Sequence, residues 1–430
     1  MADARYVTRK TTKLFEQDTG TPWHMILIFG DEVEVTGPKK NKRFPVTFRE
    51  RAGWIDEGHL GADPVLEMYF IDVGQGDSTF IVTPGRKTIP VDGGIDDSAL
   101  RFLAWKYRLD RPGNVAPIDL LVLTHGDEDH LVGLRLLLED ARFDVKRIVH
   151  SGVASYKKGA HDTELGKLAE HAGVKYIVTR HDKVTQLTGQ LSDAFKGWKA
   201  AVQRAIGDGA TYGAVHAGDG TIDVGDPSVT IEVLGPVLTQ VPGAPKAYRW
   251  FGDKAHTING HSVVLRLRYG LVGALLSGDL NIEGSQHLMA EPSVVGNLAA
   301  HVLKAPHHGS HEYHRPLLEA VRPQLSVISS GDDPDHGHPR ASFLGVIGAA
   351  SRSPSPLLFS TEIAATFVED KRVHSADDPA ADRALESERK TYKRRLHGMI
   401  NVRTDGQKIV AARRVAAGYW WESYEVSPHP

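Results

Sequence analysis

The sequence predicts an α/β protein in which two mixed β-sheets pack face to face with helices outside, an αββα sandwich. Two observations lead to this prediction. Short β-rich runs come first in pairs, at roughly ten-residue spacing. Later in the chain, from residue 229 on, strand-like runs alternate with helical stretches. A doubly wound parallel sheet would instead alternate strand and helix from the start.

Composition bounds the class of protein. The 430 residues are 41% apolar and 24% charged, enough for a large core in one large or several smaller domains. The net charge of −3 gives no strong overall attraction to nucleic acid or anionic membrane. Cysteine is absent, which excludes disulfides, thiolate metal ligands and a cysteine nucleophile. The most apolar run, 271–276, is too short to cross a bilayer, and no signal peptide is visible. We therefore expect a cytoplasmic protein without membrane contact.

Three segments are predicted. Residues 1–64 form a small β-rich N-terminal unit, with a strand or a hairpin at 24–37. Residues 65–370 form the main domain, in which 151–228 is predicted as a lid insertion with a helix at 191–206. Residues 371–430 form a basic helix (381–397) and a terminal hairpin (399–414) packed on the core. Residues 371–414 contain 12 Lys and Arg but only 6 Asp and Glu. This basic stretch could contact phosphates, or it could be a solvated helix face.

The elements of the main domain follow from apolar periodicity and turn residues. Its strands are expected at 65–74, 78–82, 88–92, 119–125, 146–150, 229–235, 262–270, 271–279, 301–308, 325–331 and 364–370. Its helices are expected at 98–108, 131–140, 281–291 and 314–321.

The densest chemistry lies in THGDEDH, residues 124–130, between a buried strand and a helix. Two histidines and two aspartates within six positions of one turn can converge on one or two cations. Further His and Asp residues stand beside other predicted strands, and strand ends at one sheet edge bring distant residues together. These groups are HTINGH at 256–261, SGD at 277–279, APHHGSHEYH at 305–314 and DHGHP at 335–339.

Residues 65–345 resemble the metallo-β-lactamase superfamily, and most of all its ComEC-type, competence-associated branch. The superfamily signature HxHxDH appears in the branch's form, with Asp in place of the second His, at 125–130. Other branch motifs occur in family order, at 72–77 (DVGQGD), 92–93 (Asp-Gly), 278–279 (Gly-Asp), 307–310 (HHGS) and 338–339 (His-Pro). The flanks 1–60 and 350–430 are not covered.

The resemblance implies a ligand set for two divalent ions, zinc or manganese, one of them weakly held. The first ion would bind His125 and Asp127, and the second Asp129, His130 and His308. Asp279 would bridge the two ions. The ligand of the third family motif is open among His256, Asn259 and His261, because the branch's Asn-rich stretch is only partly present. His261 either restores that ligand or is a polar loop residue.

Other residues receive supporting roles from the same resemblance. Asp72, Asp77 and Asp92 would orient ligands and turns. His307 would orient a ligand or contact substrate, and His338 would position substrate or stabilise developing charge. Asp129 could also orient the attacking water or accept its proton.

The implied activity is hydrolysis by metal-bound hydroxide. A phosphodiesterase or nuclease acting on DNA or another nucleotide substrate is the first hypothesis, since the branch is associated with DNA degradation. A hydrolase of a small ester, lactone or thioester is the alternative, and a non-catalytic, metal-stabilised binding protein is a third. Protein partners cannot be inferred from the sequence.

Overall fold

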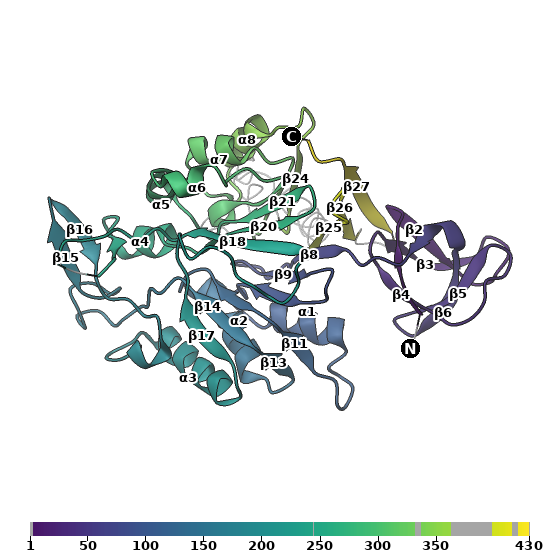
Figure 1. The fold of residues 1–430 in the computed structure, drawn as a ribbon, viewed down its shortest axis with the longest axis horizontal. Helices are drawn as coiled ribbons and strands as arrows, with labels where there is room; N and C mark the ends of the chain where they lie inside the picture. Colours follow the sequence, from purple (N-terminus) through teal and green to yellow (C-terminus); the bar gives the residue numbers. More distant parts are fainter. Residues whose placement is uncertain (1–2, 244, 332–336, 363–397, 415–419, 430) are drawn as a thin grey trace, which may run out of the picture.

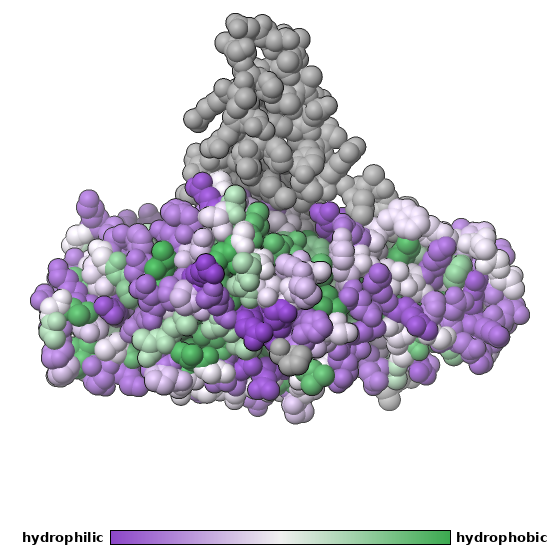
Figure 2. Space-filling model, turned by 90° about the horizontal axis from the view of Figure 1, so that it is seen from above, coloured by the Kyte–Doolittle hydropathy of each residue, from purple (hydrophilic) through white to green (hydrophobic). Residues whose placement is uncertain are grey.

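The computed structural model describes residues 3–243, 245–331, 337–362, 398–414 and 420–429 (Figure 1). The strand predicted at 364–370 and the basic helix predicted at 381–397 lie outside these residues. None of the helices in the described ranges is long and apolar enough to span a bilayer. On the face seen in Figure 2, hydrophilic and hydrophobic residues are interspersed.

The N-terminal unit is a seven-stranded antiparallel sheet, at the right end of Figure 1, with its own small core. Its core side chains are apolar and include Leu14, Leu27 and Ile55. Its strands, in the order β3-β2-β6-β5-β4-β1-β7, are β1 (Asp3–Val7), β2 (Thr11–Phe15), β3 (Trp23–Ile28), β4 (Glu32–Val35), β5 (Arg43–Phe48), β6 (Arg51–Asp56) and β7 (Leu60–Gly61).

The first sheet of the main body has nine strands in the order β17-β14-β12-β10-β9-β8-β25-β26-β27. They are β8 (Leu66–Phe70), β9 (Thr79–Val82), β10 (Thr88–Val91), β12 (Leu121–Leu123), β14 (Arg147–His150), β17 (Thr211–Ala214), β25 (Ile400–Thr404), β26 (Ile409–Arg414) and β27 (Trp421–Val426). The C-terminal hairpin is therefore part of this sheet, because β25 pairs antiparallel with β8.

The second sheet has six strands in the order β18-β20-β21-β22-β23-β24. They are β18 (Val229–Gly235), β20 (Val264–Tyr269), β21 (Val272–Leu276), β22 (Val302–Lys304), β23 (Leu325–Ile328) and β24 (Leu357–Ser360). From β21 to β24 all pairings are parallel, so these strands end at one edge of the sheet.

Apolar side chains of both sheets interlock in one central cluster, to which Phe70 and Val122 come from the first sheet and Leu265 and Val302 from the second. The outer face of the first sheet is covered by α1 (Ser98–Tyr107), α2 (Glu128–Glu139) and α3 (Asp193–Gly207). The outer face of the second is covered by α5 (Ile282–Met289), α6 (Pro292–Val295), α7 (Arg315–Val321) and α8 (Ala341–Ala350). The predicted αββα sandwich is confirmed.

The shorter elements lie around this sandwich. They are η1 (Glu57–His59), β11 (Ala116–Ile118), β13 (Phe143–Val145), β15 (Leu168–His171), β16 (Val174–Ile177), η2 (Val184–Gln186), β19 (Tyr248–Arg249), α4 (Lys254–Gly260) and η3 (Pro306–Gly309).

The segment 151–228, predicted as a lid, is partly core, and the prediction needs this correction. Its strand β17 is an edge strand of the nine-stranded sheet, parallel to β14. Its helix α3 buries Phe195 and Trp198 against leucines of α2. An amphipathic helix with two large aromatics on one face stabilises the fold through this burial.

A buried charge network ties the N-terminal unit to the sandwich. Arg403 of β25, 5% exposed, donates 2.8 Å hydrogen bonds to the carbonyl of Phe29 and to Asp31 Oδ1, both beyond β3. On its other side it donates to the Tyr69 hydroxyl, 3.2 Å away, which in turn hydrogen-bonds Glu67. Because the charges are removed from water, each depends on the others for compensation.

The network predicts a stability change in acid. Burial favours the neutral acid, but Lys106 and Arg403 lower the pKa of Glu67 from 4.5 to about 2. A depressed folded-state pKa gives stability that is present above pH 4.5 and lost as pH falls towards 2. The contribution is about 3 kcal/mol. Denaturant titrations between these pH values should show a smaller pH dependence for Glu67→Gln than for the parent, and an equal dependence would contradict the assignment.

Candidate metal centre

The residues of the candidate centre come from strand ends of both sheets. Asp92 follows β10, and Thr124 and His125 follow β12, which is parallel to β10. His130 lies in the first turn of α2. From the other sheet, Asp279 follows β21, and His308 lies in η3 after β22. Parallel strands deliver their C-terminal ends to the same edge, which is why residues far apart in sequence meet here.

His130 is oriented by a carboxylate. Its Nδ1 donates to Asp92 Oδ2 over 2.9 Å, and both side chains are buried. Asp92 also accepts from the backbone N–H and the hydroxyl of Thr124, at 2.8 and 2.7 Å. With Nδ1 protonated, the lone pair of Nε2 points into the centre, as in carboxylate–histidine–metal arrangements.

His125 and His308 are held in the same tautomer as His130, with Nδ1 as the donor. His125 Nδ1 lies 3.1 Å from the Thr124 hydroxyl, whose proton is given to Asp92, so the ring donates and its Nε2 is left as acceptor. His308 Nδ1 donates to the carbonyl of Ser329 over 3.1 Å. His308 and its neighbour His307 both have left-handed backbones, with φ of 52° and 46°. Such backbone in non-glycine residues is costly and is typical of functional sites.

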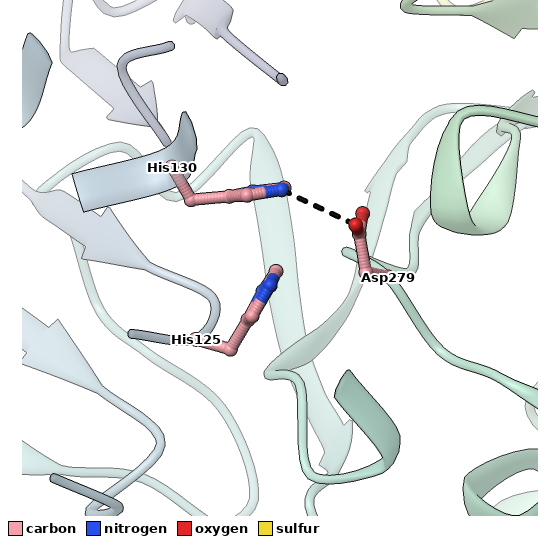
Figure 3. A group of neighbouring side chains, drawn as sticks. All are labelled: His125, His130 and Asp279. Carbon is pink, nitrogen blue, oxygen red and sulfur yellow. Dashed lines mark ion pairs between the residues drawn. The ribbon is translucent and has the colours of Figure 1, made fainter. Parts of the chain in front are cut away.

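Asp279 is the point at which the imidazoles meet (Figure 3). Its Oδ2 lies 2.9 Å from His308 Nε2 and 3.3 Å from His130 Nε2. Although burial favours the neutral acid, His308 and His130 hold the pKa of Asp279 well below its usual range. Although burial also favours neutral rings, Asp279 raises the pKa of both histidines. A cation that replaces these protons would therefore bind in a pH-dependent way.

Asp127 and Asp129 form the side of the centre that reaches solvent. Asp127 is the N-cap of α2, its side chain is 36% exposed, and its Oδ2 lies 3.7 Å from His125 Nε2. Asp129 Oδ2 lies 3.6 Å from His308 Nε2. Both carboxylates lie at the N-terminus of α2, although burial raises the pKa of Asp127.

The donor set fits divalent ions. The Nε2 atoms of His125, His130 and His308 are buried, make no well-aligned hydrogen bond, and face carboxylate oxygens at 3.7, 3.3 and 2.9 Å, as metal ligands would. Four overlapping groups in the described residues have ligand atoms within 4.8 Å of one another, among them His125, His130 and Asp279, and Asp129, His130 and His308. A mixture of imidazoles and carboxylates suits zinc and manganese alike.

The turn at 72–77 positions the ligand loop. Gly76 has φ of +99°, and a Cβ at this position would come within 1.9 Å of the carbonyl oxygen of Asp129. The glycine therefore permits the close backbone approach at which Asp77 N–H donates to the same carbonyl, 3.3 Å away. Asp72 lies in this turn and accepts weakly from Gly74 N–H, at 3.4 Å.

Of the residues considered for the third ligand motif, His256 and His261 belong to none of the groups with metal-ligand spacing among the described residues, and the prediction for His261 needs correction. Its Nε2 lies 2.8 Å from the carbonyl of Arg249, and its ring stacks on Phe251 at 4.9 Å. The end of α4 turns this side chain away from His125. His256 instead pairs with Asp253 and Glu312, and the carbonyl of Asn259 accepts from Ser262.

The remaining predicted residues lie around the centre. Asp77 approaches His308 Nδ1 at 3.4 Å, which suits an orienting role. His307 Nδ1 lies 3.5 Å from Glu312. The ring of His338 stacks beside His308 with centroids 6.1 Å apart, and lies 5.9 Å from that of His307. Both rings border the centre without joining its ligand groups.

Three contributing residues were not predicted. The Ser262 hydroxyl accepts from Asp279 N–H at 3.1 Å and lies 3.4 Å from His125 Nδ1, where the sequence offered only a strand start. Thr124 could have been inferred from its place before His125. Lys304 is buried beside Asp279, and its only sequence signal is a lysine inside an apolar strand.

Residues 71–225 match the model of the metallo-β-lactamase superfamily. The chain is 27% identical over 296 residues to ComE operon protein 3 of Bacillus subtilis (strain 168), covering 65% of this chain and 30% of the relative. It is 39% identical over 82 residues to competence protein ComA of Neisseria gonorrhoeae, covering 19% and 12%. The chain thus spans less than a third of these relatives, and the resemblance to the ComEC-type branch is confirmed.

Solved structures with similar chains include Tm1679, described as a metal-dependent hydrolase of the β-lactamase superfamily. The TM-score is 0.35 at 12% identity, over 69% of this chain and 95% of the other. A metallo-β-lactamase mutant from Cronobacter sakazakii gives a TM-score of 0.29 at 13% identity, over 74% and 95%.

Proposed function

We propose that this chain, which carries a metallo-β-lactamase superfamily domain of the ComEC-type branch, is a metal-dependent phosphodiesterase acting on DNA or another nucleotide substrate. The supporting observation is the convergence on Asp279 of three buried imidazole nitrogens, none of which makes a well-aligned hydrogen bond. A purely structural cluster would satisfy such nitrogens within the protein.

The proposed ligands would hold two ions. His125, Asp127 and Asp279 would hold one ion, and Asp129, His130, His308 and Asp279 the other. When bound, such ions lower the pKa of water to near 7 and stabilise negative charge on a phosphoryl oxygen. Asp129 faces the solvent side, with an 18% exposed side chain, and is placed to orient the attacking water and accept its proton.

The surrounding rings suit a phosphate-bearing substrate. His307 and His338 stand beside His308 at the edge of the centre, where an imidazole N–H can donate to a non-bridging phosphoryl oxygen. One relative is a competence protein, which supports a nucleic-acid substrate. Since the chain carries a net charge of −3, binding would depend on these local groups more than on the overall field.

The test compares substrate classes on protein stripped of metal and reloaded with Mn²⁺ or Zn²⁺. We expect cleavage of single- or double-stranded DNA and of bis-nitrophenyl phosphate, and no comparable cleavage of nitrophenyl esters. Asp129→Ala should reduce the rate by roughly 100-fold or more, since it removes a ligand and a proton acceptor. Asp140→Ala, beyond the opposite end of α2, is the matched control and should retain activity.

Other outcomes would assign a different function. Ester cleavage without phosphodiester cleavage would favour the hydrolase of small esters, lactones or thioesters. Full metal occupancy with no turnover of either class would favour the metal-stabilised binding protein.

A further inference from the structure

A lysine stands inside the candidate metal centre. Lys304, the last residue of β22, is 3% exposed. Its Nζ contacts Asp77 Oδ2, donates to the carbonyl of Gly278 over 3.0 Å, and lies 3.6 Å from Asp279 Oδ1. Lysine is almost never fully buried unless it is paired, so these contacts account for its position.

Lys304 lies beside one carboxylate oxygen of Asp279 and one of Asp77. In Asp279, Oδ2 faces His130 and His308, whereas Oδ1 faces the lysine. In Asp77, Oδ2 contacts the lysine, and Oδ1 lies 3.4 Å from His308 Nδ1. Each carboxylate therefore presents one oxygen to an imidazole and the other to the Nζ of Lys304.

The buried carboxylates of Asp77 and Asp279 need cationic partners. Asp77, Asp279 and His308 have ligand atoms within 4.8 Å of one another, a group that could itself hold a cation. The Nζ of Lys304 lies within ion-pair distance of both carboxylates, as expected for a lysine placed between two acids. Without Lys304, the oxygen of each buried carboxylate that does not face an imidazole would lose its partner, which carries a large desolvation cost.

We propose that the Lys304 ammonium is a built-in counter-ion of the metal centre, which balances Asp77 and Asp279 before any metal binds and leaves only Oδ2 of Asp279 for the ions. The Lys304 ammonium occupies the position of a cation in the group formed by Asp77, Asp279 and His308, so this group binds no further ion. This inference rests on the proposed metal centre and assigns Lys304 a positioning role.

The experiment measures thermal unfolding of Lys304→Met with and without saturating Mn²⁺. The metal-free variant keeps two buried carboxylates, each without the lysine that faced one of its oxygens, and a bound ion compensates for part of that loss. We therefore expect the metal-induced rise in Tm to exceed that of the parent protein by at least about 3 °C. Calorimetric titration with Mn²⁺ should show tighter binding or an additional ion in the variant.

Lys106→Met is the matched control, because Lys106 is a lysine with low exposure, paired with Glu67 away from the centre. It should lower Tm equally with and without metal, as a purely structural lysine would. An unchanged or smaller metal-induced shift in Lys304→Met would overturn the role of Lys304 while leaving the proposed function standing. Absence of any Mn²⁺ or Zn²⁺ binding by the parent protein would overturn both.

A second measurement covers the case in which Lys304→Met does not fold. In a crystal structure of the metal-loaded parent protein, Asp279 should bind metal through Oδ2 alone, with Lys304 Nζ still between Oδ1 and Asp77. Coordination of a metal by Asp279 Oδ1 or by Asp77 would refute the proposal.

Discussion

Asp279→Asn is expected to abolish phosphodiester hydrolysis and to weaken metal binding more than any other single substitution in the centre. Asp279 Oδ2 is the only carboxylate oxygen within 3.3 Å of two of the inward-facing imidazole nitrogens among the described residues. The amide removes the charge that holds both ions together. Loss of an outer partner costs roughly 10- to 100-fold in affinity or activity, and loss of a shared ligand should cost more.

Elemental analysis and calorimetric titration of Asp279→Asn would measure this, with rates on bis-nitrophenyl phosphate alongside. His261→Phe is the control, since its ring packs on Phe251 and its Nε2 is engaged by the carbonyl of Arg249. That variant should bind both ions as the parent does. Two tightly bound ions in Asp279→Asn, or loss of one in His261→Phe, would contradict the ligand assignment.

Arg403→Met is expected to destabilise the protein by about 3–5 kcal/mol, the largest effect on stability that the structure predicts. The substitution leaves Asp31 and Glu67 as carboxylates without their guanidinium, and the carbonyl of Phe29 without its donor. Glu67 is 7% exposed, so water cannot replace the lost partner. Denaturant unfolding, with the free energy extrapolated to water, would measure the loss.

Arg413→Met on the neighbouring strand is the matched comparison. Arg413 pairs with Glu422 at 2.6 Å, and both side chains are about one-third exposed. A pair of this kind contributes about 0–1 kcal/mol, so the variant should unfold close to the parent. Equal effects of the two substitutions would show that burial does not decide the strength of these ion pairs. Metal binding should be unchanged in both, since neither residue reaches the centre.

The sequence determined the layers of the main domain and most ligands of the centre. Paired β-runs followed by alternating strands and helices predicted the αββα order, because periodicity depends on which face of each element is buried. His125, Asp127, Asp129 and His130 share one strand-to-helix turn, so their proximity follows from local geometry. Asp279 and His308 were predicted from motifs at strand ends, since parallel strands end at one edge.

Only the tertiary structure decided which side chains complete the centre. His261 and Ser262 are adjacent in sequence, yet the end of α4 sends His261 towards Phe251 and Ser262 towards Asp279. Whether Lys304 is a core residue or a counter-ion depends on Asp77, which arrives from the other sheet. The contact of Lys304 with Asp77 joins residues more than two hundred positions apart, and it is fixed by how the two sheets pack. Local sequence patterns indicate which face of each element is buried, but they do not indicate how one sheet is oriented on the other.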